Sequence, residues 1–212
     1  MLDPGLTSKI RNTGKKLKAL AYSLKRKKRP EISYLPDFTA KSVGDIDFAL
    51  LKKLGVRHLL FDLDQTLRRP YSRHLEKDVV TLLKAVQSSR QFLSLNLVSN
   101  NQRKLNRFSD PIDANVYQPF RRGLKYIRKP NPDFFTYVLD SINTKPEHTA
   151  MIGDRLHADV LGGNRMGMYT IYMAKRGPVD YWFDWLLLTR LRDNRRLRDA
   201  IAEHRTKRLR KK

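Results

Sequence analysis

The chain has 212 residues, of which 40% are apolar, so it can supply the core of one domain with further segments at its ends. It contains no cysteine, which excludes disulfides and cysteine-based zinc sites, and its formal charge of +23 predicts a polyanionic partner, either nucleic acid or an anionic membrane. No apolar run approaches the roughly 18 residues of a spanning helix, and no secretory signal pattern is present, so we expect a cytoplasmic protein with no transmembrane helix.

Residues 1–30 are expected to form a basic, amphipathic N-terminal segment. Residues 6–29 contain ten Lys or Arg and no acidic residue. If this stretch is a helix, five of its apolar residues fall within an arc of about 80°, and lysines project from the opposite face. The five are Leu6, Ile10, Leu17, Leu20 and Leu24. Such a helix can lie in an anionic membrane surface, so we expect peripheral association with the membrane. A disordered basic tail, or a helix packed on the domain, is the alternative interpretation.

Residues 31–180 are expected to form one α/β domain, because apolar strand patterns alternate with helical ones. The patterns predict four strands, at His58–Asp64, Leu93–Val98, Ala150–Gly153 and Tyr169–Met173. They predict helices at Leu75–Ser89 and Pro132–Ile142. This alternation indicates a Rossmann-like parallel sheet with helices on both faces, and such sheets bind ligands beyond the carboxyl ends of their strands.

Two carboxylates, Asp62 and Asp64, stand where the first predicted strand ends. A carboxylate can attack phosphorus once magnesium and fixed cations offset the repulsion between their negative charges. We therefore interpret Asp62 as a nucleophile and Asp64 as the general acid and base that protonates the leaving alkoxide and then activates water. Taken without the rest of the sequence, the pattern of Asp62, Asp64 and Thr66 has an alternative interpretation, namely a strand that ends in an ordinary polar turn.

Further polar residues follow the other predicted strands and one helix start. Ser99 can donate a hydrogen bond to a phosphoryl oxygen, and Lys129 can neutralise developing charge, although Lys125 is a rival for that role. Asp154 can share an octahedral magnesium ion with Asp62, and Asp159 is placed to orient Lys129 or the metal waters. The alternatives are ordinary turns and a solvated lysine.

The order of these residues resembles the four motifs of the haloacid dehalogenase-like (HAD) superfamily over residues 40–175. The resemblance implies a Mg²⁺-dependent phosphatase in which Asp62, Asp64, Ser99 and Lys129 are catalytic. It also implies substrate contacts from Thr66, Asn100 and Arg165, and a metal site formed by Asp62, Asp64, Asp154 and Asp159. The spacings between the motifs leave room for helices and loops but for no cap domain.

A narrower resemblance concerns the stretches SNN at 99–101 and GDRLHADVLGGNRMG at 153–167. They are similar to the YqeG-type subclass IIIA phosphatases, a group similar to phosphatidylglycerophosphate phosphatases. In this stretch Gly162 and Gly163 permit close backbone approach, and Asn164 and Arg165 either brace the metal loop or meet a head group; helix packing is the alternative. The stretch before Lys129 is longer than expected for that group, and Arg121 and Arg122 within it are candidate phosphate contacts.

Residues 181–212 are expected to form an aromatic and then basic C-terminal segment. An aromatic and leucine cluster at 181–188 precedes Arg190–Lys212, which holds eleven Lys or Arg against three acidic residues. A site without a cap suits a phosphate carried on a large surface, and the resemblance to the YqeG-type group implies phosphatidylglycerophosphate at an anionic phospholipid membrane as the substrate. The alternatives are a phosphatase for nucleic-acid end phosphates and a non-catalytic RNA-binding protein with a HAD fold.

Overall fold

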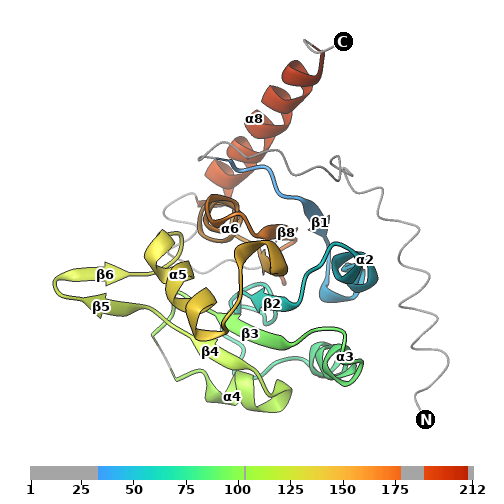
Figure 1. Ribbon diagram of the computed structural model, residues 1–212, viewed down its shortest axis with the longest axis vertical. Helices are drawn as coiled ribbons and strands as arrows, with labels where there is room; N and C mark the ends of the chain where they lie inside the picture. Colours follow the sequence, from blue (N-terminus) through green and yellow to red (C-terminus); the bar gives the residue numbers. More distant parts are fainter. Residues whose placement is uncertain (1–32, 103, 178–188, 210–212) are drawn as a thin grey trace.

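The computed structural model describes residues 33–102, 104–177 and 189–209 (Figure 1). Its centre is a six-stranded sheet in the order β1-β8-β7-β2-β3-β4, in which every neighbouring pair is parallel. The strands are β1 (Phe38–Ala40), β2 (His58–Phe61), β3 (Ser94–Val98), β4 (Asn115–Tyr117), β7 (Thr149–Gly153) and β8 (Tyr169–Met173). The parallel α/β fold predicted from the sequence is confirmed.

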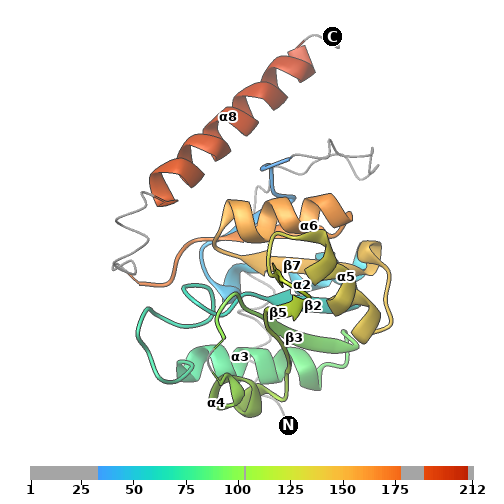
Figure 2. The ribbon, with the colours of Figure 1, turned by 90° about the vertical axis from the view of Figure 1, so that its left-hand side faces the viewer.

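Helices cover both faces of this sheet (Figure 2). One face packs against α2 (Phe48–Lys53), α3 (Lys77–Ser88) and α4 (Asn106–Ser109), and the other against α5 (Pro132–Ser141) and α6 (Leu161–Met166). Side chains alternate along each strand, so Leu59 and Phe61 enter the first layer and Leu60 enters the second. Single helical turns, η2 (Val43–Asp45), η3 (Asp110–Ile112) and η4 (Pro146–His148), complete the connections.

Each of the six predicted elements is present, and half of their twelve ends shift by one to three residues. The first strand is shorter than predicted, because β2 ends at Phe61 and the carboxylates that follow lie beyond the sheet. The short strands β1 and β4 and a hairpin of β5 (Phe120–Arg122) and β6 (Lys125–Ile127) were not predicted. Three residues are too few to display a period of two, so the sequence alone gives no signal for them.

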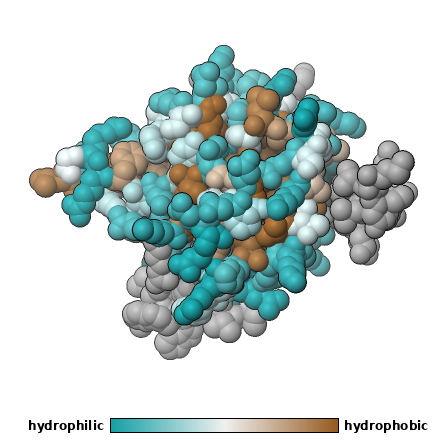
Figure 3. Space-filling view, turned by 90° about the horizontal axis from the view of Figure 1, so that it is seen from below, coloured by the Kyte–Doolittle hydropathy of each residue, from teal (hydrophilic) through white to brown (hydrophobic). Residues whose placement is uncertain are grey.

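The hairpin and the last helix extend from the domain. The hairpin turns at Gly123, whose φ of +61° suits glycine, and it projects to the left in Figure 3 with a hydrophobic end. Helix α8 (Thr189–Leu209) points away from the sheet (Figure 2), but its Asp193 Oδ2 accepts a hydrogen bond from Leu156 N at 3.1 Å. That amide opens η5 (Leu156–Val160), a π-helical turn that leads directly into α6.

Two expectations concern residues outside the described part of the chain. They are the amphipathic helix within residues 6–29 and the aromatic cluster at 181–188. Among the described residues, no helix combines the length and apolar character needed to cross a bilayer.

Candidate active site

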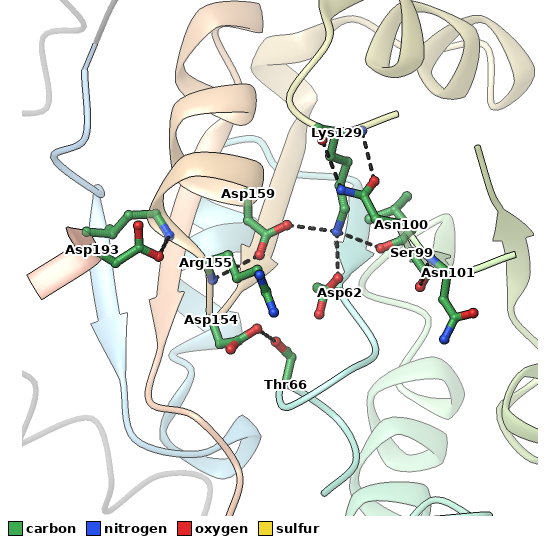
Figure 4. A network of polar contacts seen from close by, with 12 residues as sticks. Asp62, Thr66, Ser99, Asn100, Asn101, Lys129, Asp154, Arg155, Asp159 and Asp193 are labelled. Carbon is green, nitrogen blue, oxygen red and sulfur yellow. Dashed lines mark hydrogen bonds and ion pairs between the residues drawn. The ribbon is translucent and has the colours of Figure 1, made fainter. Parts of the chain in front are cut away.

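The polar residues that end three neighbouring strands meet at one edge of the sheet (Figure 4). Asp62 follows β2, Ser99 follows β3 and Asp154 follows β7, and the parallel register aligns these strand ends. All three are buried, with exposed fractions of 8%, 1% and 0%. The sheet therefore places a hydroxyl and two carboxylates together in a largely water-excluded site, at the edge predicted from the sequence.

Lys129 reaches this edge from the segment after β6. Its Nζ donates to Asp62 Oδ1 at 2.6 Å, to Asp159 Oδ1 at 2.8 Å and to the Val98 carbonyl at 2.8 Å. Burial works to lower its pKa, but the carboxylates of Asp159 and Asp62 outweigh that effect and raise it. Lys129 is thus held as a cation against Asp62.

Asn100 fixes the backbone of that lysine. Its side-chain amide donates to the Lys129 carbonyl and its oxygen accepts from the Lys129 amide, both at 2.9 Å. Lys125, the rival considered from the sequence, lies exposed on β6 in the hairpin. The structure therefore brings Lys129, and not Lys125, to the carboxylates.

Three buried carboxylates, those of Asp62, Asp154 and Asp159, offer ligand atoms within 4.8 Å of one another. Burial raises the pKa of Asp62 to about 8; Lys129 opposes this, while the nearby charges of Asp159, Asp154 and Asp64 add to it. The neighbouring carboxylates thus add to the cost of ionising Asp62. A bound cation would offset that cost, and clustered carboxylate oxygens are the ligands that a divalent cation such as Mg²⁺ prefers.

Asp159 is positioned by the π-helical turn η5 and by Gly153, which has no side chain that would occupy the space of the carboxylate. The Arg155 amide donates to Asp159 Oδ2 at 3.1 Å, and Lys129 holds the other oxygen. A Cβ on Gly153 would lie 2.1 Å from Asp159 Oδ2 and 2.4 Å from its Cγ. Only glycine at residue 153 leaves room for this carboxylate.

Asp64 is not one of the three clustered carboxylates, and it contacts an arginine that the sequence analysis did not single out. Arg68 Nη2 donates to Asp64 Oδ1, and Arg68 Nη1 donates to the Ser72 carbonyl. The arginine side chain is 6% exposed and that of Asp64 is 22% exposed. The spacing of four residues was the only available signal, and it carries little weight in a chain with 44 Lys and Arg.

The remaining predicted site residues occupy different surroundings. Thr66 donates to Asp154 Oδ1 at 3.1 Å, and Ser99 Oγ accepts from the Asn101 amide at 3.1 Å. Arg165 is exposed on α6, and Arg121 and Arg122 are exposed on β5. Thr66 and Ser99 therefore lie within the site, whereas the three arginines lie on the surface.

The glycines of α6 serve helix packing, which was the alternative to a role near the site. A Cβ on Gly162 would lie 2.4 Å from the Phe135 ring, and one on Gly163 would lie 2.6 Å from Thr170 Cγ2. Asn164 donates to the backbone carbonyls at residues 33 and 35, at 2.8 and 3.0 Å. These residues hold α6 against α5, the sheet and the segment that enters β1.

Comparison with known proteins identifies the family. The family model described as HAD-hydrolase-like matches residues 126–176. A Bacillus subtilis protein named "Probable phosphatase YqeG" is 30% identical over 151 residues, which cover 69% of this chain and 81% of that relative. The chain belongs to the HAD superfamily. It is a HAD-type phosphatase, a phosphoric monoester hydrolase, as the resemblance of its motifs predicted.

Other similarities are shorter or weaker. A Pyrococcus furiosus protein named "Glyceraldehyde 3-phosphate phosphatase" is 41% identical over 46 residues, which cover 22% of this chain and 19% of the relative. The solved structure of an uncharacterized protein from Listeria monocytogenes serotype 4b covers 64% of this chain and 99% of its own, with a TM-score of 0.47 and 19% identity.

Proposed function

We propose that this HAD-type phosphatase forms an aspartyl-phosphate on Asp62 and hydrolyses the terminal phosphate of phosphatidylglycerophosphate at an anionic membrane surface. The observation that carries the mechanism is the contact of buried Asp62 with Lys129 beside two further carboxylates, Asp154 and Asp159. Lys129 offsets charge at the nucleophile while the cluster provides oxygen ligands for a cation. The substrate is supported by the similarity of the motifs to the YqeG-type group.

The two steps use the residues of the site in turn. Asp62 attacks phosphorus, the bond to the leaving oxygen breaks, and Asp64 gives that oxygen its proton. Asp64 then takes a proton from water, which attacks the acyl-phosphate, releases inorganic phosphate and restores the Asp62 carboxylate. Arg68 donates to Asp64 Oδ1 and so orients the carboxyl group, and in the proposal the other oxygen transfers the proton.

Bound Mg²⁺ would supply charge neutralisation and orientation of the phosphoryl group, held by oxygens of Asp62 and Asp154. Asp159 contacts Lys129, so its role in the proposal is to position that lysine beside Asp62. Ser99 and Thr66 are the hydroxyl groups within the site, and we assign Ser99 as a donor to a phosphoryl oxygen.

A surface-bound substrate is favoured by the absence of a cap domain in the described chain and by the β5–β6 hairpin. In the described chain, no separate domain is inserted between the motifs. The hairpin carries Leu124, which is 99% exposed, and three exposed cations, Arg121, Lys125 and Arg122, the last of which pairs with Asp133 at 3.3 Å; a fourth, Arg128, follows β6. A protruding apolar side chain surrounded by cations suits the head-group region of an anionic bilayer. Strand β6 leads from this hairpin to Lys129, so docking through it would bring lipid phosphates near the site.

The test is phosphate release from vesicles that contain phosphatidylglycerol and phosphatidylglycerophosphate, with Mg²⁺ present. Leu124→Gln should weaken vesicle binding by about tenfold, since burial of a leucine side chain contributes roughly 1.5–3 kcal/mol. The matched control is Leu93→Gln, which changes a leucine that is 72% exposed outside the hairpin. Equal binding by both variants would contradict the docking role, and phosphate release from water-soluble esters alone would contradict the lipid substrate.

Helix α8 favours a second candidate, a phosphatase for nucleic-acid end phosphates. Its first half exposes Arg192, Arg195 and Arg198, and the buried Asp193 contacts the domain. A cationic helix of this kind can follow a phosphate backbone without an apolar face. The same assay with 5′- and 3′-phosphorylated oligonucleotides separates this candidate from the lipid phosphatase.

A further inference from the structure

A pocket of about 320 Å³ opens between the loop that follows β2 and the segment that follows β3. Its lining includes four cationic side chains, those of Arg68, Arg73, Lys104 and Arg107. Phe108 adds an aromatic surface, and no described lining residue is acidic. The volume lies near the lower end of the range for small-molecule sites, which is about 300–1,000 Å³.

Arg68 connects this pocket to the catalytic carboxylate Asp64. Its guanidinium group lines the pocket, donates to Asp64 Oδ1, and lies 4.9 Å from the centre of the Phe108 ring. Asn101 also lines the pocket, and its backbone amide donates to Ser99 Oγ at 3.1 Å. Two lining residues of the pocket therefore contact the proposed general acid and the hydroxyl of the active site.

The exposed cations of the pocket keep their charge available for a ligand. No carboxylate in the described part of the chain forms an ion pair with Arg73, Lys104 or Arg107. Like charges that gather around one hollow repel one another, and an anion bound between them relieves that repulsion. The chemistry of the lining therefore selects a negatively charged group.

We infer that this pocket binds a second anionic group on the leaving alcohol. The inference rests on the proposed role of Asp64, because the carboxyl group that protonates the leaving oxygen must lie beside the rest of the alcohol. Arg68 donates a hydrogen bond to Asp64 and also lines the pocket, so the pocket is next to the expected position of that alcohol. Preferred substrates are then phosphomonoesters whose alcohol portion carries a further phosphate, free or in a diester, a few bonds from the ester that is cleaved. Lipid head groups and oligonucleotide ends both offer this chemistry.

The test compares two soluble probes that differ only in the second phosphate, 3-hydroxypropyl phosphate and propane-1,3-diol bisphosphate, with Mg²⁺ present. The wild-type protein should show the higher kcat/KM for the bisphosphate. The double variant Lys104→Ser/Arg107→Ser should lower the ratio of the two kcat/KM values by about fivefold or more, mainly through KM, since exposed ion pairs contribute modestly. The control Lys77→Ser/Lys84→Ser removes two exposed cations of α3 and should keep the ratio.

Binding provides a readout that does not depend on turnover. The bisphosphate is titrated calorimetrically into Asp62→Asn protein with and without Lys104→Ser/Arg107→Ser. The two pocket substitutions should raise the Kd of the bisphosphate by about fivefold, as they lower the ratio of kcat/KM values. An unchanged ratio and unchanged binding would overturn the subsite even in an active phosphatase. Absence of hydrolysis of every probe, with binding that still depends on Lys104 and Arg107, would overturn the proposed function and leave the subsite standing.

Two further probes distinguish the possible sources of the anion. Glycerophosphoglycerol phosphate represents the lipid head group, and a dinucleotide with a terminal phosphate represents a nucleic-acid end. Either result is compatible with the subsite, provided that the preference depends on Lys104 and Arg107. A preference for one probe that persists in the double variant would show that another part of the protein recognises it, and would overturn the inference.

Discussion

Replacement of Gly153 by alanine should destabilise the protein through a single steric conflict. The new Cβ would lie 2.1 Å from Asp159 Oδ2 and 2.7 Å from Asp159 Cβ, so rotation of the carboxylate alone cannot relieve the overlap. Asp159 would have to withdraw from Lys129 Nζ, at 2.8 Å, and from the Arg155 amide, at 3.1 Å. Hydrogen bonds to charged groups contribute about 1.5–3 kcal/mol each, so we expect a loss of about 3 kcal/mol or more.

The measurement is urea unfolding of the purified protein at pH 7, followed by circular dichroism, with the slope m compared between variants. Gly44→Ala is the matched control, because its Cβ would make only ordinary contacts, 3.7 Å from Ser42 Oγ and 3.8 Å from a Leu82 methyl group. In an Asp159→Gly background, Gly153→Ala should cost little more than this control. A loss below about 1 kcal/mol in the wild type, or an equal loss in both backgrounds, would refute the reasoning.

Four further predictions concern the active site and the pH dependence of stability. Asp62→Asn should reduce phosphate release to about 1% or less while the circular dichroism spectrum is retained, and chelation of divalent metal with EDTA should abolish wild-type activity. Lys129→Met leaves the cluster without its cation, so it should abolish turnover and lower the free energy of unfolding by about 3–5 kcal/mol in urea titrations. Burial, together with His148 and Arg57, lowers the pKa of His58 below 6.5; protonation therefore favours the unfolded state, and stability should fall as the pH drops from 7 to 5. His58→Asn should make that fall smaller, and an identical pH profile would contradict the assignment.

The sequence was sufficient to predict the edge of the sheet at which the site lies. Each of three apolar runs ends at a polar residue, and a parallel sheet brings such ends together, so Asp62, Ser99 and Asp154 could be placed without coordinates. The alternation of strands and helices likewise predicted the fold class, because continuous apolar runs indicate buried strands and a period of 3.6 indicates helices.

Other features depend on tertiary contacts that leave no periodic pattern. Arg68 is one of 44 Lys and Arg residues, and only the folded loop shows that its guanidinium group meets Asp64. The hairpin strands are three residues each and largely exposed, so neither alternation nor an apolar run marks them. Leu156 and Asp193 are 37 residues apart in the sequence, so no local pattern predicts the hydrogen bond between them.

The hydrogen bond between Asp193 and the Leu156 amide determines how far the chain can be shortened. Sheet and core are complete at β8, and a cut between β8 and α8 would remove none of the catalytic residues. It would nevertheless strip the buried amide at residue 156 of its acceptor, directly before the turn that carries Asp159. Arg196, which pairs with Asp193 at 3.4 Å and lies 5.1 Å from the centre of the Tyr34 ring, would be lost as well. The first turns of α8 thus belong to the folded domain, and we expect the shortest active chain to end inside the helix, C-terminal to residue 196.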